Sequence, residues 1–268
     1  MIDIHHHLLP GVDDGTKDFD TSVAMAKIAV EDGITHVSCS PHANSQYNFD
    51  RQRYEGITQA LRERLAQEGV PLTIGLGCDF HLSYDNLQAA LADHNPYTIN
   101  GKGYLLVELP DYGLPRGLTE TFYNIQVAGM TPILTHPERN PTLQADMSRL
   151  VSWLRGGLLI QVTSNSVTGK MGKAAQKMSH QLLANRWVHF LATDAHNTTS
   201  RPPRMSEARK IVEKKYGKEY AHALCVDNPM AAYNGATMPP QTEPLRLYDN
   251  LEDESWLKRT WAMLKNAK

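Results

Sequence analysis

The stretch Ala128-Gly-Met-Thr-Pro-Ile-Leu-Thr-His136 contains the unit from which the fold is predicted. An amphipathic helical stretch precedes it, and Gly129 is typical of a residue that ends a helix. The aliphatic run at 131–135 is typical of a buried strand, and His136 stands directly after it. The same order of helix, glycine, strand and polar side chain recurs along most of the chain.

Further glycines, Gly33, Gly69 and Gly157, each precede another aliphatic run. Strands are predicted near 2–5, 34–39, 71–77, 104–107, 131–135, 158–162 and 187–192, with helices near 20–31, 51–68, 83–92, 117–128, 143–154 and 172–184. Alternating strands and helices favour an α/β fold, and we expect a distorted seven-stranded β/α (TIM-like) barrel. A doubly wound open sheet remains an alternative, because periodicity alone does not distinguish the two.

The repeated unit predicts one domain over residues 1–235, since barrels of about 200 to 250 residues commonly form a single domain. Residues 236–268 are predicted to form a C-terminal extension that begins near Pro239 and Pro240. An apolar stripe in this extension indicates a final amphipathic helix; its members are Leu251, Trp256, Leu257, Trp261 and Leu264. Docking of this helix on its own barrel is favoured over a contact with another subunit or partner.

Composition excludes several classes of function. A net charge of −2 over 268 residues argues against broad nucleic-acid binding, and the sequence has no apolar run long enough to span a bilayer. With no secretory signal and three scattered cysteines, we expect a cytoplasmic protein. No cysteine has an arginine six residues downstream, so the thiolate loop of cysteine-dependent tyrosine phosphatases is missing. The oligomeric state stays open.

Histidines and carboxylates follow the predicted strands at their carboxyl ends, where β/α barrels build active sites. They are His5, His7, His42, Asp79, Glu108, His136, Asp194 and His196. In an extended strand, His5 and His7 share one side, so both can bind one ion while His6 points elsewhere. A mixed set of imidazoles and carboxylates suits manganese, iron or zinc better than calcium. His81, two residues from Asp79, is a weaker candidate for the same site.

Two arginines accompany these residues. Arg139 follows His136 by three positions, and Arg201 follows His196 by five. A planar guanidinium offers two parallel donors that fit a phosphate group, so both are predicted to bind phosphate. Arg204 is expected to begin the next helix and to face solvent.

The chain resembles the bacterial PHP-type (polymerase-and-histidinol-phosphatase) protein-tyrosine phosphatases of capsule and exopolysaccharide operons, the CpsB and YwqE type. The resemblance covers residues 1–233 and rests on Met-Ile-Asp-Ile-His-x-His at 1–7, Val-Asp-Asp-Gly at 12–15, Ser-Pro-His at 40–42, Val-Glu at 107–108, Thr-His-Pro-Glu-Arg at 135–139, Gln-Val-Thr-Ser-Asn-Ser at 161–166, Thr-Asp-Ala-His-Asn at 193–197, Arg-Pro-Pro at 201–203 and Asp-Asn-Pro at 227–229.

The resemblance implies three divalent ions, most simply Mn²⁺, with iron, zinc or cobalt as alternatives. The first ion would be held by His5, His7 and Asp194, the second by Glu108 and His136, and the third by Asp14, His42 and His196. Asp79 would bridge the first two ions. The resemblance implies a glutamate at this position, so the shorter Asp79 leaves the spacing of the two ions open.

The implied reaction is in-line attack on phosphorus by a hydroxide held between two ions, while Arg139 and Arg201 hold the phosphoryl oxygens. His42 or His196 could supply a proton to the leaving group. The implied substrate is a phosphotyrosine protein, a bacterial tyrosine kinase of polysaccharide export. Asn165, Tyr47 and Tyr112 are further candidates for binding the substrate, since an open mouth with aromatic walls suits phosphotyrosine.

Three other functions compete with this interpretation. A small-metabolite phosphatase of the histidinol-phosphate type could use the same metals. An amidohydrolase also places His-x-His after its first strand, but it usually adds a bridging lysine, which no predicted strand end here supplies. An inactive metal-binding module is disfavoured, because the expected ligand positions other than Asp79 are intact.

Overall fold

Parallel strands form two sheets in the computed structural model, which describes residues 1–111 and 113–249. Their bounds are β1 (Ile2–His6), β2 (His36–Cys39), β3 (His42–Ala43), β4 (Thr73–Leu76), β5 (Asp79–His81), β6 (Tyr104–Glu108), β7 (Thr131–Thr135), β8 (Leu159–Thr163) and β9 (Phe190–Ala192). One sheet has the order β1-β2-β4, and the other has the order β3-β5-β6-β7-β8-β9. The predicted parallel α/β architecture is thus confirmed.

The single seven-stranded closed barrel is not confirmed, because the second and third predicted strands are each followed by a further short strand that belongs to the other sheet. The run at 34–39 becomes β2, and β3 follows it after Pro41, which has no N–H to donate to a ladder. The run at 71–77 becomes β4, and β5 follows it after Gly77 and Cys78. The described residues therefore contain nine strands in two sheets in place of seven in one.

The two sheets meet where β1 ends beside β9. The backbone N–H of His7 donates to the Ala195 carbonyl at 2.9 Å, and that of Asp194 donates to the His5 carbonyl at 2.9 Å. This contact brings the carboxyl ends of the first and last strands together. Ligand candidates far apart in sequence therefore reach one end of the molecule.

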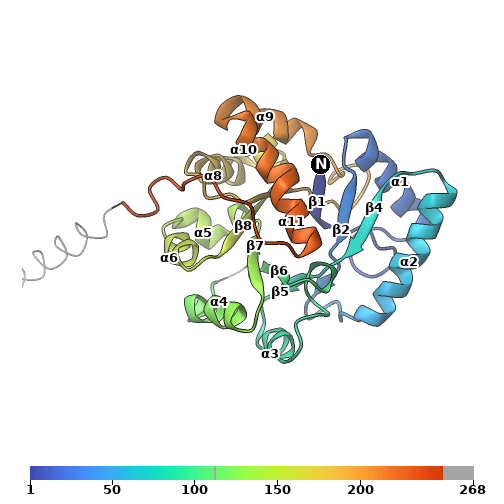
Figure 1. The fold of residues 1–268 in the computed structure, drawn as a ribbon, viewed down its shortest axis with the longest axis horizontal. Coiled ribbons are helices and arrows are strands. Elements are labelled where there is room, and N and C mark those ends of the chain that lie inside the picture. Colours follow the sequence, from blue (N-terminus) through green and yellow to red (C-terminus); the bar gives the residue numbers. More distant parts are fainter. Residues whose placement is uncertain (112, 250–268) are drawn as a thin grey trace, which may run out of the picture.

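Helices surround the strands (Figure 1). They are α1 (Phe19–Glu31), α2 (Arg51–Gln67), α3 (Tyr84–Ala92), α4 (Leu118–Val127), α5 (Pro141–Ala145), α6 (Arg149–Arg155), α7 (Ser164–Thr168), α8 (Lys173–Ala184), α9 (Ser206–Tyr216), α10 (Lys218–His222) and α11 (Asn228–Asn234), with short helical turns η1 (Ile99–Gly101), η2 (Pro137–Arg139) and η3 (Ala223–Asp227). The helix predicted at 143–154 is divided into α5 and α6. No helix within the described ranges is long and apolar enough to cross a bilayer.

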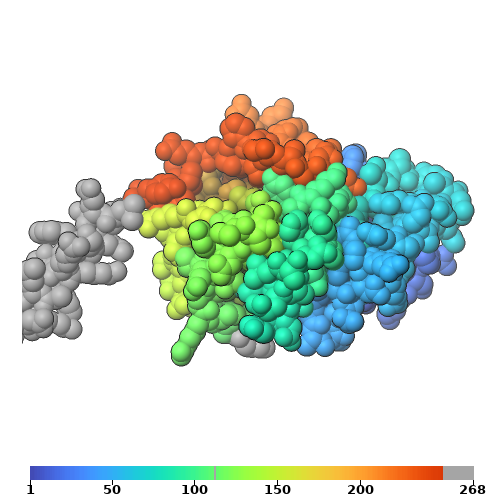
Figure 2. Space-filling model, turned by 60° about the horizontal axis from the view of Figure 1, so that its bottom comes forward, coloured from blue at the N-terminus to red at the C-terminus, as the bar shows by residue number. Residues whose placement is uncertain are grey.

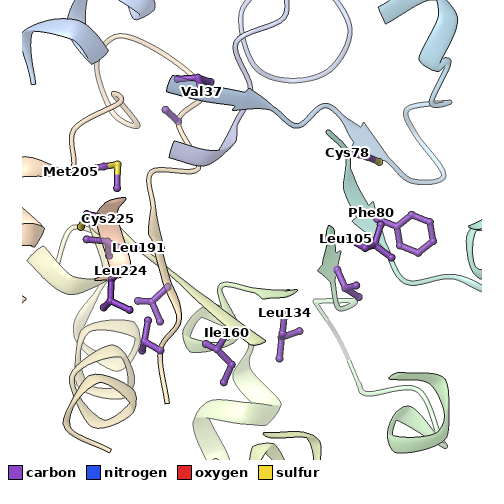
Figure 3. Packing of buried hydrophobic residues seen from close by; sticks show 14 of the residues in the cluster. Val37, Cys78, Phe80, Leu105, Leu134, Ile160, Leu191, Met205, Leu224 and Cys225 are labelled. Carbon is purple, nitrogen blue, oxygen red and sulfur yellow. The ribbon is translucent and has the colours of Figure 1, made fainter. Parts of the chain in front are cut away.

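Alternation along the strands builds two hydrophobic clusters. The larger cluster includes Leu105, Leu134 and Ile160, which are labelled in the close view of Figure 3. Tyr104 and Leu106 of β6 belong to the other cluster. Because side chains two apart share a face of a strand, Glu108 continues the row of Tyr104 and Leu106. Packing thus directs its carboxylate to the site at the strand ends.

Residues 236–249 run along the body without forming a further helix or strand. The indole N–H of Trp187 donates to the Leu245 carbonyl at 2.9 Å, and Arg155 Nε donates to the Leu247 carbonyl at 2.9 Å. Figure 2 shows these last described residues, in red, against the middle of the chain. The final helix predicted from Leu251 to Leu264 lies outside the described residues.

Candidate metal centre

The predicted ligands gather at the carboxyl ends of the strands. His5 lies in β1, His42 in β3, Asp79 in β5 and Glu108 at the end of β6. His7 and His136 directly follow β1 and β7, whereas Asp14 lies in the loop after β1, and Asp194 and His196 lie in the loop after β9. Four groups have ligand atoms within 4.8 Å of one another, namely His7, Asp14, His42 and His196; His5, Asp79 and His136; His5, His7 and Asp194; and His42, Asp79 and Glu108. The structure therefore brings together all nine residues that the sequence proposed.

Asp79 lies at the centre of the site and is fully buried. Its Oδ2 atom is 3.4 Å from His5 Nε2 and 3.1 Å from His42 Nδ1. Neither carboxylate oxygen accepts a hydrogen bond from the described residues. Burial acts to raise the pKa of Asp79, but His5 and His42 hold it well below its usual range. A buried carboxylate that is ionised yet not hydrogen-bonded fits a site for a cation.

Asp194 joins the histidines to the arginines. Its Oδ1 lies 3.4 Å from His5 Nε2 and 3.3 Å from His7 Nε2. Its Oδ2 accepts hydrogen bonds from both Arg139 and Arg201. Asp194 has a positive φ of 51°, which is uncommon outside glycine and clusters at functional sites. The two guanidinium groups thus lie side by side at the edge of the ligand cluster.

His7, Asp14, His42 and His196 form the most open part of the site. Asp14 Oδ1 lies 3.3 Å from His42 Nε2 and 3.4 Å from His196 Nε2, and half of the Asp14 side chain is exposed. The rings of His7 and His196 have centroids 3.9 Å apart. The resemblance placed His7 with His5 and Asp194, whereas the structure also brings it into the group around Asp14.

Glu108 and His136 form the other side of the site. Glu108 Oε1 lies 3.5 Å from His136 Nε2, and Oε2 lies 3.8 Å from His42 Nδ1. His136 has a positive φ of 32°, and burial holds its pKa well below the usual range, so the imidazole is neutral and free to bind a metal. His81 Nδ1 lies 3.7 Å from Glu108 Oε2, so this weaker candidate lies beside the site.

Two residues that sequence reasoning missed orient the ligand histidines. Asp13 Oδ2 lies 2.8 Å from His7 Nδ1 and accepts the backbone N–H of His42 at 3.2 Å. Gln161 Oε1 lies 3.0 Å from His5 Nδ1. Each contact holds a proton on Nδ1, so Nε2 of His5 and of His7 faces the cluster. For Asp13 the only available signal was its place beside Asp14.

Asp13→Ala is therefore expected to weaken metal binding by about 10- to 100-fold, because His7 loses the group that fixes its ring. Titration of the metal-free protein with Mn²⁺ in a calorimeter measures this change. Asp20→Ala, which removes an exposed carboxylate of α1, serves as the matched control and should keep the wild-type affinity. Equal affinities for the two variants would remove Asp13 from this role.

The remaining candidates have different positions. The Tyr47 ring is stacked on His42, with centroids 6.0 Å apart and planes 14° apart, so it borders the site. Asn165 is buried at the start of α7 and belongs to none of the four groups. Tyr112 lies outside the described residues. A small cleft beside the cluster is lined by Asp111, His136, Arg139 and Asn140, among others.

Most of the chain is similar to known proteins. Residues 1–234 match the family described as capsular polysaccharide synthesis, CpsB/CapC. Tyrosine-protein phosphatase YwqE of Bacillus subtilis is 32% identical over 92% of this chain and 97% of YwqE. Tyrosine-protein phosphatase CpsB of Streptococcus pneumoniae is 31% identical over 85% of this chain and 96% of CpsB. A crystal structure from work on YwqE and CpsB, described as metal-dependent tyrosine phosphatases, has a TM-score of 0.86 at 32% identity and covers 91% of this chain and 98% of its own.

Proposed function

Because this chain belongs to the CpsB/CapC family of capsular polysaccharide synthesis, we propose that it is a metal-dependent tyrosine phosphatase. The observation that carries this function is the buried ligand cluster around Asp79, beside which Arg139 and Arg201 converge on Asp194. The family predicted from the sequence motifs is confirmed. The rival metabolite phosphatase and amidohydrolase are not favoured by the relatives.

Three divalent ions are proposed to occupy the cluster. The first would be bound by His5, His7 and Asp194, the second by Glu108 and His136, and the third by Asp14, His42 and His196, with Asp79 between the first two. Nitrogen and oxygen donors in this mixture suit Mn²⁺, and iron, zinc and cobalt fit the same donors. Bound ions would lower the pKa of a water molecule and offset negative charge on the phosphoryl group.

Around these ions, the protein's own residues would hold the substrate. Arg139 and Arg201 are proposed to donate hydrogen bonds to the phosphoryl oxygens, since both guanidinium groups reach the same edge of the cluster. Tyrosinate, with a solution pKa near 10, is a fair leaving group. A proton from His42 or His196 would help but is not essential.

Tyr47 is proposed to contact the aromatic ring of the substrate, because its own ring lies at the mouth of the site on His42. Tyr112 and Asn165 are further candidates, of which Asn165 has the weaker support because it is buried. The proposed substrate is a phosphotyrosine protein, a bacterial tyrosine kinase of polysaccharide export. The family's description as a capsule synthesis family supports this partner.

Removal of metal tests the proposal directly. Protein treated with a chelator is expected to lose hydrolysis of a phosphotyrosine peptide, and added Mn²⁺ should restore it, because ions bound by the cluster would supply the activation of water. Phosphate release measures the rate, with histidinol phosphate as the competing substrate. No activity with manganese, iron, zinc or cobalt would refute the phosphatase. A preference of about 100-fold in kcat/KM for histidinol phosphate, or about 2.7 kcal/mol, would move the substrate class.

A further inference from the structure

An apolar groove runs between α4 and α6 on the outside of the molecule. Phe122, Tyr123 and Gln126 of α4 line one wall, and Trp153 of α6 and Gly156 line the other. Tyr123 is 64% exposed, although it is a large aromatic residue. The lining is mainly apolar, which favours a contact with another apolar segment, and none of its residues is a candidate metal ligand.

The groove continues into a basic rim. A neighbouring depression shares Gly117 and Trp153 with the groove and is also lined by Arg116 and Arg149. Arg155 stands at the end of α6, directly before Gly156 of the groove. All three arginine residues are exposed. The rim is therefore suited to a segment that is apolar on one side and acidic at one end.

The described chain ends beside this groove. Arg155 Nε donates to the Leu247 carbonyl at 2.9 Å, and the Arg155 guanidinium lies 5.9 Å from the centre of the Tyr248 ring. Exposed Leu245 and Tyr248 add apolar surface here. The red end of the described chain can be followed to this side of the molecule in Figure 2. Whatever follows residue 249 starts next to α6.

The sequence that follows, residues 250–268, matches the groove in chemistry. Leu257, Trp261 and Leu264 are spaced by four and three residues, so they would share one face of a helix. Glu252, Asp253 and Glu254 stand at the start of that stretch, where they could meet the arginine residues of the rim. A helix from 251 to 264 would be about 21 Å long, which is ample to cross two helices packed about 10 Å apart.

We propose that the groove between α4 and α6 binds residues 250–268 of the same chain. Trp261 and its neighbours on the stripe would cover Tyr123 and Trp153, and the acidic start would lie against Arg149 and Arg155. Binding of residues 250–268 from the same chain is favoured over binding of those from a second copy, because a short tether gives an effective concentration in the millimolar range. None of the groove residues is a candidate metal ligand, so this contact is separate from the proposed phosphatase activity.

Cross-linking in the full chain tests the contact. Tyr123→Cys combined with Trp261→Cys should be joined by a short bis-maleimide, because the two side chains would lie within a few ångströms. The native cysteines Cys39, Cys78 and Cys225 are all buried, so the introduced pair should be the reactive one. The matched control is Gln67→Cys with Trp261→Cys, since α2 lies across the molecule from α6 (Figure 1).

A link within one chain in the Tyr123 pair, independent of protein concentration and at least about tenfold faster than in the control, is the expected result. A link between two chains, or equal rates for both pairs, would overturn the proposal. As a second measurement, Tyr123→Asp should speed tryptic cleavage after Lys258 or Arg259 by about tenfold, since cleavage follows the open population. Cleavage at the wild-type rate would also overturn it. Phosphatase activity equal to that of the wild type shows that each variant is folded. If the wild-type protein itself has no phosphatase activity, the proposed function is refuted, but the cross-linking result still tests this contact.

Discussion

Asp79→Asn is expected to lower kcat/KM for a phosphotyrosine peptide by at least about 10³-fold, or about 4 kcal/mol of transition-state stabilisation. Asparagine keeps the shape of the side chain but removes the negative charge that lies within 3.4 Å of both His5 and His42. Bound metal ions would supply several kcal/mol of charge stabilisation in the transition state. Loss of the Asp79 carboxylate should therefore lower kcat/KM nearly as much as loss of the metal ions. Steady-state kinetics with Mn²⁺ and metal analysis by mass spectrometry measure both effects.

Two variants sharpen this experiment. Asp85→Asn makes the same chemical change at an exposed position of α3 and should leave kcat/KM within about twofold, as expected of a surface substitution. Asp79→Glu keeps the carboxylate and adds one methylene to a fully buried site, at a cost of about 1 kcal/mol, so activity should stay within about tenfold. Wild-type turnover and metal content in Asp79→Asn would place this residue outside the centre.

The ligand positions were predictable from the sequence because they depend on strand ends. A histidine or carboxylate directly after a buried run, such as Glu108 or His136, must lie at the carboxyl end of a parallel sheet. The division of the sheet was not predictable to the same degree. Only Ser40 and Pro41 separate β2 from β3, so the sequence shows no long loop that would reveal a break in the ladder.

The arrangement within the cluster depends on three-dimensional contacts that spacing does not encode. His7 reaches both Asp194 and the group around Asp14, because the end of β1 is hydrogen-bonded to the chain beyond β9. Asp13 was not among the predicted site residues, yet its carboxylate lies 2.8 Å from His7 Nδ1. A residue that orients a metal ligand is identified by the direction in which its side chain points, and the sequence pattern does not give that direction.

Arg139→Ala and Arg201→Ala are each expected to lower kcat/KM by about 10²- to 10³-fold, the usual cost of removing one donor to developing negative charge. Both guanidinium groups reach Oδ2 of Asp194, so a phosphate at this edge of the cluster would accept hydrogen bonds from both. The alternative role is to neutralise Asp194 and stabilise the fold. The two roles separate in kinetics at saturating Mn²⁺, since only loss of phosphate binding also weakens inhibition by inorganic phosphate.

Arg204→Ala is the matched control, because Arg204 is exposed and lies only three residues after Arg201. It should change neither kcat/KM nor phosphate inhibition by more than about twofold. Arg139→Lys keeps the charge but not the planar pair of donors, so it should recover only part of the loss. The contrary result is that Arg139→Ala keeps its kcat/KM and its inhibition by phosphate while its free energy of unfolding falls. The Arg139 guanidinium would then stabilise Asp194 and the fold. The phosphoryl group would have to be held by Arg201 and the metal ions.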